Sequence, residues 1–498
     1  MEVILAISPI LIVLLMLFVL KQSVVRAGIV GCIASIIIAF ILPEFELLLI
    51  DIPYPVIKGL LTTSIVAYVL LFGILLFNLM NEEGVIRSFA ALVAKSTEDP
   101  VRQVLILAVA LSPLIESSSG FGLAAIVIAP ILIALGFKPY KAVLISLVSL
   151  SAVPWGSLAT GTVIGANLAG LSAQELGAGT ALLSIPTFIY FSYIIAFIAD
   201  GWVGIKRRFF EILFIALTLG GSVWAFSHFI SVELAGVFGS MVALGVELVL
   251  IQLFQKKPLS VSQVAVTRDG ATHHPFKALS PYLFLVVLLL SSRIIPWYKN
   301  FSTNNLVIAL PEYQHTLPII FNPGFFLFLA CIFTIVIFNI EGNHIKISLH
   351  KTFRQWTPVI ISTLFFVIMA EVMSVSGMIH ILSVNAALLF GGMFFYISPL
   401  IGGLGGFLAG SNTGSNSMFI NLQVQTANQL GLSSNWVAFA QNASSSHLIM
   451  ANPSRILLTA SIGEIPEKQN ELLNKIGWIG LGTVLIICIE MIVANLML

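Results

Sequence analysis

The chain alternates long apolar segments with short polar loops over nearly its whole length. A helix needs about 20 apolar residues to cross a bilayer. We predict membrane spans at 3–20, 27–42, 60–80, 142–170, 178–199, 209–230, 232–254, 278–296, 323–340, 357–383, 436–463 and 476–498. Two further stretches, 103–137 and 384–432, are too long for one straight span. The pattern predicts an all-α polytopic membrane protein with about 12–14 transmembrane segments.

Composition supports the same class of protein. The 498 residues are 58% hydrophobic and 9% charged, whereas a soluble domain carries about 25% charged residues. A formal net charge of +1 provides no basic face, so we expect no nucleic-acid partner. Cys32, Cys331 and Cys488 are far apart and have no metal-ligand spacing, so we expect neither a disulfide, a metal site nor a cofactor. These features predict a multi-pass protein of the cell membrane, in contact with the lipid bilayer.

A polar interruption, Glu-Ser-Ser-Ser-Gly-Phe-Gly at 116–122, lies in the middle of the stretch 103–137. A carboxylate in hydrocarbon costs about 2.5–3.5 kcal/mol, so Glu116 must face protein or a cavity. Unwound backbone at this depth must also line a polar cavity. Lysine and arginine in short loops mark the cytoplasmic side, and the basic loops share one side only if 103–137 enters and leaves on one face. We therefore predict a two-pass or re-entrant hairpin with its tip near 116–122.

The second half contains a comparable pattern. No Lys, Arg, Asp or Glu occurs between Ile381 and Ser454, and this stretch contains the break 410–416. A hairpin without flanking basic residues is expected to open outward, so the two hairpins would form an inverted-topology repeat. Each break is followed by a second polar interruption, at 154–157 and at 452–454. We predict an N-terminal repeat, 1–254, with its hairpin near 103–137, a cytoplasmic connecting loop, 255–277, and a C-terminal repeat, 278–498, with its hairpin near 384–432.

Two motifs resemble signatures of a known family. The ESSSGFG run at 116–122, followed by an apolar helix ending in Leu-Gly-Phe at 135–137, resembles the E-x-x-x-G-F-G signature of the bacterial L-lactate permease family. The GSNTGSNSMFINLQ run at 410–423 resembles the family's second signature, G-S-[DN]-T-x-S-N-x-x-F-x-x-L-Q. The resemblance implies proton-coupled uptake of lactate, glycolate or another 2-hydroxy monocarboxylate. The chain departs from the family pattern at 123–124, where Thr-Pro is common, and at 452–455, where a Pro-Gln-Asn run is common.

The residues themselves suit a small carboxylate as substrate. Helix N-termini at the two breaks would present N–H groups and positive dipole ends to it, without a full positive charge. We expect substrate contacts from Ser117, Ser118, Ser119, Gly120, Phe121, Gly122, Trp155, Gly156, Ser157, Ser411, Asn412, Thr413, Ser415, Asn416 and Asn442. Because burial favours the neutral form of a carboxyl group, Glu116 is the expected proton carrier. Glu371 and His447 are further proton-coupling candidates.

Structural roles compete with these functional ones. Glu116 could instead cap the broken helix at Ser118 or Ser119, Glu371 could pair with a neighbouring helix, and Trp155 could serve packing. The hydroxyl and carbonyl groups of the breaks would also coordinate Na⁺, so a sodium-coupled carboxylate transporter is the alternative function. A membrane-embedded enzyme is disfavoured, because the sequence lacks ligand spacing for haem, metal or iron-sulfur clusters and lacks a nucleotide-binding glycine loop. The sequence does not indicate an oligomeric state.

Overall fold

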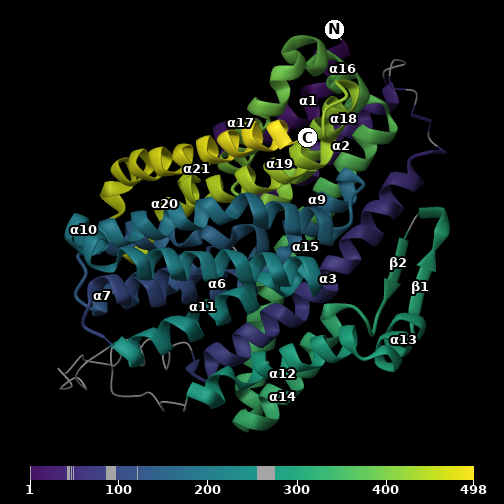
Figure 1. Cartoon of the computed structure of the whole chain (residues 1–498). Helices are drawn as coiled ribbons and strands as arrows, with labels where there is room; N and C mark the ends of the chain where they lie inside the picture. Colours follow the sequence, from purple (N-terminus) through teal and green to yellow (C-terminus); the bar gives the residue numbers. More distant parts are fainter. Residues whose placement is uncertain are drawn as a thin grey trace.

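The computed structural model describes residues 2–41, 45, 47–48, 50–85, 97–120, 122–254, 275–313 and 315–497. Most of its helices run along one common axis, and a short β-hairpin stands apart from them (Figure 1). Within the described ranges, nine helices are long and apolar enough to cross a membrane, or up to ten if one bent helix pair counts as a span. Three shorter apolar helices accompany them. The prediction of an all-α polytopic membrane protein is confirmed.

In the described part of the first half, the regular secondary structure consists of helices. Its elements are α1 (Glu2–Leu14), η1 (Leu15–Val19), α2 (Val24–Ile41), α3 (Pro53–Glu82), α5 (Pro100–Val104), η3 (Leu105–Leu111), α6 (Ser112–Ser119), α7 (Leu123–Ala134), α8 (Pro139–Val148), η4 (Leu150–Trp155), α9 (Gly156–Ala169), α10 (Ala173–Phe229) and α11 (Val232–Phe254). The predicted spans 178–199 and 209–230 both lie in α10. The backbone of α10 leaves the helical region at Gly201 and Arg208, in the segment with basic residues at 206–208 that separates the two predicted spans.

The second half adds the small antiparallel sheet. Its elements are α12 (Pro275–Ile294), α13 (Pro296–Asn304), β1 (Val307–Leu310), η5 (Pro311–Tyr313), β2 (His315–Pro318), α14 (Pro323–Phe338), α15 (Gly342–Val375), α16 (Met378–Phe390), η6 (Gly391–Met393), α17 (Phe394–Ala409), α18 (Asn412–Gln429), α19 (Ser434–Leu448), η7 (Ile449–Ala451), α20 (Pro453–Ile462), η8 (Pro466–Lys468) and α21 (Gln469–Met497). Residues 255–274, most of the predicted connecting loop, lie outside the described ranges.

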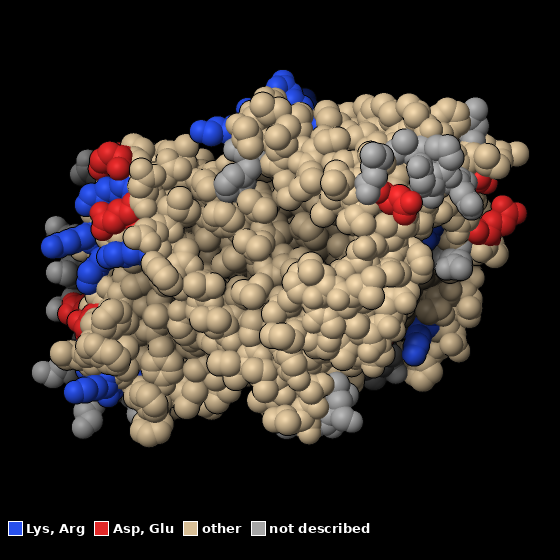
Figure 2. All heavy atoms as spheres, turned by 90° about the horizontal axis from the view of Figure 1, so that it is seen from above, with Lys and Arg blue, Asp and Glu red and all other residues tan. Residues whose placement is uncertain are grey.

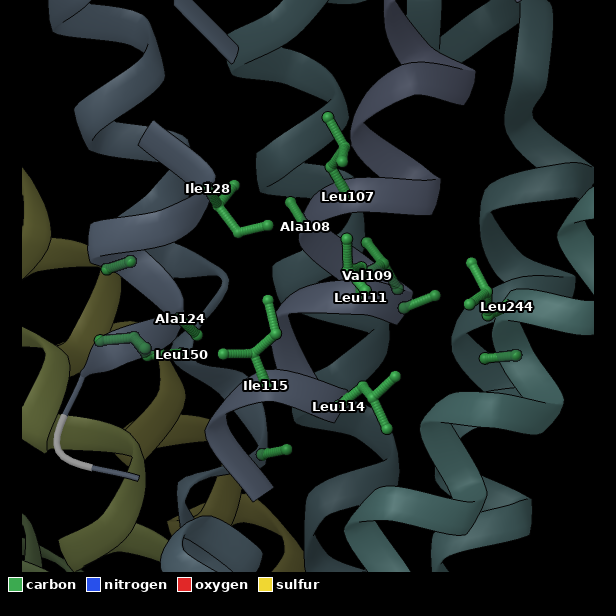
Figure 3. Close-up of a cluster of buried hydrophobic side chains, with 14 of the residues drawn as sticks. Leu107, Ala108, Val109, Leu111, Leu114, Ile115, Ala124, Ile128, Leu150 and Leu244 are labelled. Carbon is green, nitrogen blue, oxygen red and sulfur yellow. The ribbon is translucent and has the colours of Figure 1, made fainter. Parts of the chain in front are cut away.

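Both halves contain a helical hairpin followed by a broken helix. In the first half, α5, η3 and α6 form one run that ends at Ser119, and α7 begins at Leu123. After this break α7 packs against α6, and Figure 3 shows Ala124 and Ile128 of α7 in the same buried cluster as Ala108 and Ile115. In the second half, α18 packs back on α17 across a break at Gly410. The broken helices are α8–η4–α9 and α19–η7–α20, as the paired polar interruptions predict.

The first hairpin lies inside the bundle. Every residue in the apolar window of 100–119 is buried, and 94% of the window in 139–169 is buried, whereas the windows of the other candidate spans are 33–61% buried. A helix that is apolar on all sides and shielded from lipid is a core helix. The carboxylate and hydroxyl groups near its end are therefore surrounded by protein and not by hydrocarbon chains.

The two hairpins enter the bundle from opposite ends. Lys141, which follows the first hairpin, donates to the carbonyl of Ala199 at 3.2 Å. Asn435, which follows the second hairpin, donates to the carboxylate of Glu175 at 2.7 Å. Glu175 and Ala199 belong to one regular stretch of α10 and, at 1.5 Å per residue, are about 36 Å apart. Inverted-topology repeats would place the hairpins in this way, and the division into two such repeats stays a prediction.

Basic loops gather at the end of the bundle where the first hairpin enters. Arg102 is 2.7 Å from Glu211, and both Arg207 and Arg208 lie 2.9 Å from Asp99. Burial alone would raise the pKa of Asp99, but the hydrogen bond and charge of Arg208 outweigh it and hold that pKa below its ordinary value. In Figure 2, charged side chains lie mainly at the edges of the face shown, and the centre is almost free of them. An uncharged band between charged ends is the surface that a bilayer requires.

Candidate functional site

A cavity of about 390 Å³ lies where the breaks of the two halves meet. Its size falls in the range of small-molecule sites, about 300–1,000 Å³. It is lined by Ser23, Val24, Val25, Glu116, Gly120, Leu123, Val153, Gly156, Ser157, Thr160, Gly161, Gln355, Pro358, Val359, Ser362, Thr363, Phe366, Gly410, Ser411, Asn412, Thr413 and Arg455. Seven of the predicted substrate or proton residues are in this set: Glu116, Gly120, Gly156, Ser157, Ser411, Asn412 and Thr413. Residues of both breaks, far apart in the sequence, thus line one cavity.

Glu116 combines the predicted cavity position with a capping role. Its side chain is 1% exposed, and each of its carboxylate oxygens lies 3.1 Å from the Gly122 N–H, which donates to it. The structural alternative placed that cap at Ser118 or Ser119, but their hydroxyls donate to the carbonyls of Leu114 and Ile115. Glu116 thus holds the unwound backbone in place and also presents a carboxylate to the cavity.

Gly120 allows the two breaks of the first half to come close together. Its φ of +73° and ψ of −161° lie in a region that is essentially restricted to glycine. A Cβ there would lie 1.6 Å from the Ser157 Oγ, which donates to the carbonyl of Ser119 at 3.2 Å. Ser157 itself begins a left-handed turn, with φ of +51° followed by +55° and +56° at Leu158 and Ala159. Such a turn costs about 1–2 kcal/mol per non-glycine residue, and its position at the cavity suits a functional role.

Arg455 is the cation of the cavity lining, and it is not among the predicted site residues. It lies in α20, one turn after the break at 452, and its guanidinium donates to the carbonyl of Gly410 at 3.2 Å. Its Nη1 is 3.6 Å from Oε1 of Glu116. We expected the substrate carboxylate to be bound by helix ends without a full positive charge, whereas the cavity contains the full positive charge of Arg455. The available signal was an isolated arginine in the apolar segment 436–463, directly after the neutral stretch that ends at Ser454.

The second break contributes the start of a helix. Ser411 is the N-cap of α18, and its hydroxyl accepts from the Gly414 N–H at 3.3 Å. Asn412 and Thr413 follow in the first turn and line the cavity. Because the free N–H groups and the dipole of a helix make its N-terminus attractive to anions, this part of the wall suits a carboxylate or a hydroxyl group.

Asn442 lies behind the cavity wall and joins four helices. Its Oδ1 accepts from Nδ2 of Asn412 at 2.9 Å and of Asn416 at 2.8 Å. Its Nδ2 donates to Oγ1 of Thr162 at 3.0 Å and of Thr180 at 2.9 Å. These side chains belong to α18, α9, α10 and α19. The amide is fully hydrogen-bonded to protein and buried, so it supports the hairpin tip from outside the cavity.

The other predicted residues also lie outside the cavity lining. This group comprises Ser117, Ser118, Ser119, Gly122, Trp155, Ser415, Asn416, Asn442, Glu371 and His447. The Trp155 indole donates to the Ser227 hydroxyl at 3.0 Å. Glu371 pairs with Lys58 of α3 at 2.9 Å, the partnership that the structural alternative anticipated. His447 Nε2 contacts the hydroxyls of Ser184 and Thr187 at 3.2 and 3.1 Å. Phe121 lies outside the described residues.

The cavity reaches the surface near the turn between α1 and α2. Of its lining residues, Ser23 and Pro358 are exposed, and α2 packs along α15 at this point. Lys21 and Arg26 flank the opening and are also exposed. By the charge rule, these basic residues predict that the opening faces the cytoplasm.

The direction of this opening can be tested with single cysteines. In protein whose Cys32, Cys331 and Cys488 are replaced by serine, we expect Ser23→Cys and Ser362→Cys to react with a membrane-impermeant thiol reagent from the cytoplasmic side. Gln174→Cys, exposed beside Glu175 at the opposite end, is the matched control and should react only from outside. The measurement is labelling in right-side-out and inverted vesicles. Reaction of Ser362→Cys from the outside alone would contradict the inferred opening.

Charged and polar groups of both halves meet in the cavity. Among the described residues, no group of three or more His, Cys, Asp or Glu side chains could hold a metal ion. Two hairpin tips and two broken helices surround a cavity whose lining contains one carboxylate and one guanidinium. The fold and site define a multi-pass membrane protein built like a secondary transporter.

Comparison with known proteins identifies the family. The L-lactate permease family model matches residues 2–498, so the chain belongs to that family and the resemblance of its two motifs is confirmed. The L-lactate permease of Streptococcus iniae is 26% identical, covering 88% of this chain and 93% of that protein. The glycolate permease GlcA of Escherichia coli is also 26% identical, with 94% and 91% covered. The crystal structure of the Alcanivorax borkumensis YdaH transporter shares the fold, with a TM-score of 0.50 and 14% identity over 89% of both chains.

Proposed function

We propose that this protein imports L-lactate or a related 2-hydroxy monocarboxylate, such as glycolate, by proton symport across the cell membrane. The observation that supports this most directly is the Arg455 guanidinium in a cavity between the breaks of both halves. An arginine fork matches the two oxygens of a carboxylate. The names of the relatives, which include both L-lactate and glycolate permeases, support the choice of acid.

The remaining cavity wall suits the rest of such a molecule. Asn412 and Thr413 at the start of α18, and Ser157 on the opposite break, offer amide and hydroxyl groups to the 2-hydroxyl of the substrate. Val153, Val359 and Phe366 offer apolar surface to its hydrocarbon part. A few placed polar groups in a partly apolar cavity are typical of sites that orient small ligands.

Coupling to protons is supported by the position of Glu116. It is the carboxylate of the cavity lining, and transport of one proton with one monocarboxylate anion is electroneutral. Sodium coupling is the competing possibility, because hydroxyl and carbonyl groups at hairpin tips can also bind Na⁺. The two mechanisms make opposite predictions about which gradient drives accumulation.

The test is uptake of radiolabelled L-lactate by proteoliposomes. We expect an inward proton gradient to drive accumulation, and an inward sodium gradient at equal pH on both sides to drive none. Glycolate should compete with the labelled lactate. Accumulation that requires sodium would replace proton symport by the alternative, and absence of uptake or competition for both acids would contradict the proposed substrate.

A further inference from the structure

Arg455 has hydrogen-bonding capacity that the protein leaves unused. Its Nη2 donates to the carbonyl of Gly410, but its buried Nη1 has no hydrogen-bond partner among the described residues. The nearest carboxylate oxygen, Oε1 of Glu116, is 3.6 Å away, too far for a hydrogen bond. Leaving a charged donor unsatisfied in a buried place is costly. Such a donor, in the lining of a cavity, is suited to bind an anion.

The backbone of the first hairpin sets the distance between the two charged groups, Glu116 and Arg455. A Cβ at position 122 would lie 3.0 Å from Arg455 Nη1, so glycine there leaves room for the guanidinium. The same Gly122 N–H contacts both oxygens of Glu116, each at 3.1 Å. The backbone thus holds Glu116 at a distance from which its carboxylate compensates the charge of Arg455 but accepts no hydrogen bond from the guanidinium.

Other titratable groups around Glu116 are engaged elsewhere. On the elements packed against α6, Tyr282 of α12 bonds the Ser118 hydroxyl at 3.2 Å, and Glu233 of α11 accepts from Ser231 at 2.7 Å. Glu247 of α11 is fully buried, but near Arg102 and not in the cavity lining. On α3, Lys58 pairs with Glu371. Within the described part of the chain, Arg455 provides the one cation within 4 Å of Glu116.

We propose that Arg455 binds the carboxylate of the substrate, and that the carboxylate of Glu116 competes with the substrate for the positive charge of Arg455. The substrate therefore binds when Glu116 takes up a proton, so that proton and substrate enter the site together. This inference rests on the proposed function and adds a coupling device to it. In the empty site, Glu116⁻ balances Arg455⁺. In the loaded site, a proton is bound to a Glu116 oxygen, and the substrate carboxylate accepts from Nη1 of Arg455 and balances its charge.

Charge balance explains why the two ligands bind together. The empty and loaded sites are both neutral. Substrate without a proton would leave two carboxylates facing one guanidinium, and a proton without substrate would leave Arg455 uncompensated. An uncompensated buried charge is strongly unfavourable, so both half-loaded states are rare. On the other side of the membrane the same steps run in reverse, and the proton leaves Glu116 as the carboxylate leaves Arg455.

The test measures binding and proton uptake on purified protein, without transport. Calorimetric titration with L-lactate in two buffers of different ionisation enthalpy counts the protons bound per substrate. We expect about one proton for the wild type and an affinity that falls with rising pH. Glu116→Gln should bind lactate with no proton uptake and no pH dependence. Arg455→Gln should bind at least about tenfold more weakly, and Arg455→Lys, which keeps the charge, should retain part of the affinity.

A second measurement separates this inference from the choice of substrate. Infrared difference spectra, with Glu116→Gln as the reference, follow the protonated carboxyl band of Glu116 without any ligand. We expect that band to persist to higher pH in Arg455→Gln than in the wild type, because the compensating charge is gone. Unchanged titration of the band, or proton uptake by Glu116→Gln on binding, would overturn the coupling. Failure of the wild type to bind lactate would instead contradict the proposed substrate.

Discussion

Glu116→Gln will abolish accumulation of L-lactate under an inward proton gradient, while exchange of labelled for unlabelled lactate continues. The amide is neutral like the protonated acid, so Arg455 stays available to the substrate carboxylate. The amide cannot take up or release a proton, so the proton gradient no longer drives accumulation of the substrate. A gradient of one pH unit can concentrate an electroneutrally coupled acid about tenfold. In the variant, the internal concentration should not exceed the external one, as measured in proteoliposomes.

The matched control is Glu247→Gln. Glu247 is also a fully buried carboxylate, and neither of its oxygens has a hydrogen-bond partner among the described residues, but it does not line the cavity. We expect this variant to accumulate lactate like the wild type. Continued accumulation by Glu116→Gln would remove Glu116 from the coupling mechanism. Loss of both accumulation and exchange would mean that its bond to Gly122 is needed for binding itself.

The position of the cavity could be predicted because breaks at membrane depth obey a strict physical rule. Backbone that leaves the helix in an apolar stretch must find polar partners inside the protein. The runs at 116–122 and 410–416 could therefore be placed at one site, although the chain separates them widely. The basic loops likewise predicted the first hairpin, because a straight helix over 103–137 would have put like-charged loops on opposite sides.

Which polar residues line the cavity and which ones support its wall could not be predicted, because these roles depend on the neighbours of each side chain in the fold. Asn412, Asn416 and Asn442 have the same chemistry in sequence. In the structure, Asn412 lines the cavity, whereas Asn416 donates to the Gly161 carbonyl and Asn442 to threonines of the first half. Arg455 was missed for a similar reason: its importance arises from Glu116 and Gly122, which are remote in sequence. Pairing across the two halves is a property of the fold.

Gly120→Ala should prevent the first hairpin from packing as it does in the wild type. The added Cβ would lie 1.6 Å from the Ser157 Oγ and 2.9 Å from the Ser157 backbone nitrogen, so backbone must move and not only a rotamer. The backbone conformation of Gly120 adds about 1–3 kcal/mol for any other residue, and overpacking typically adds about 1–3 kcal/mol. We expect a lower melting temperature in detergent and loss of lactate binding, measured by thermal unfolding and calorimetric titration.

Gly245→Ala is the control for this prediction, because a Cβ at Gly245 meets nothing within 4 Å. That variant should unfold at the wild-type temperature or slightly above it, since alanine favours a helix. The double variant Gly120→Ala, Ser157→Gly removes the closest clash and also suits the positive φ at 157. It should recover part of the lost stability. Wild-type stability and binding in Gly120→Ala alone would show that the two breaks are not held as closely as the cavity geometry requires.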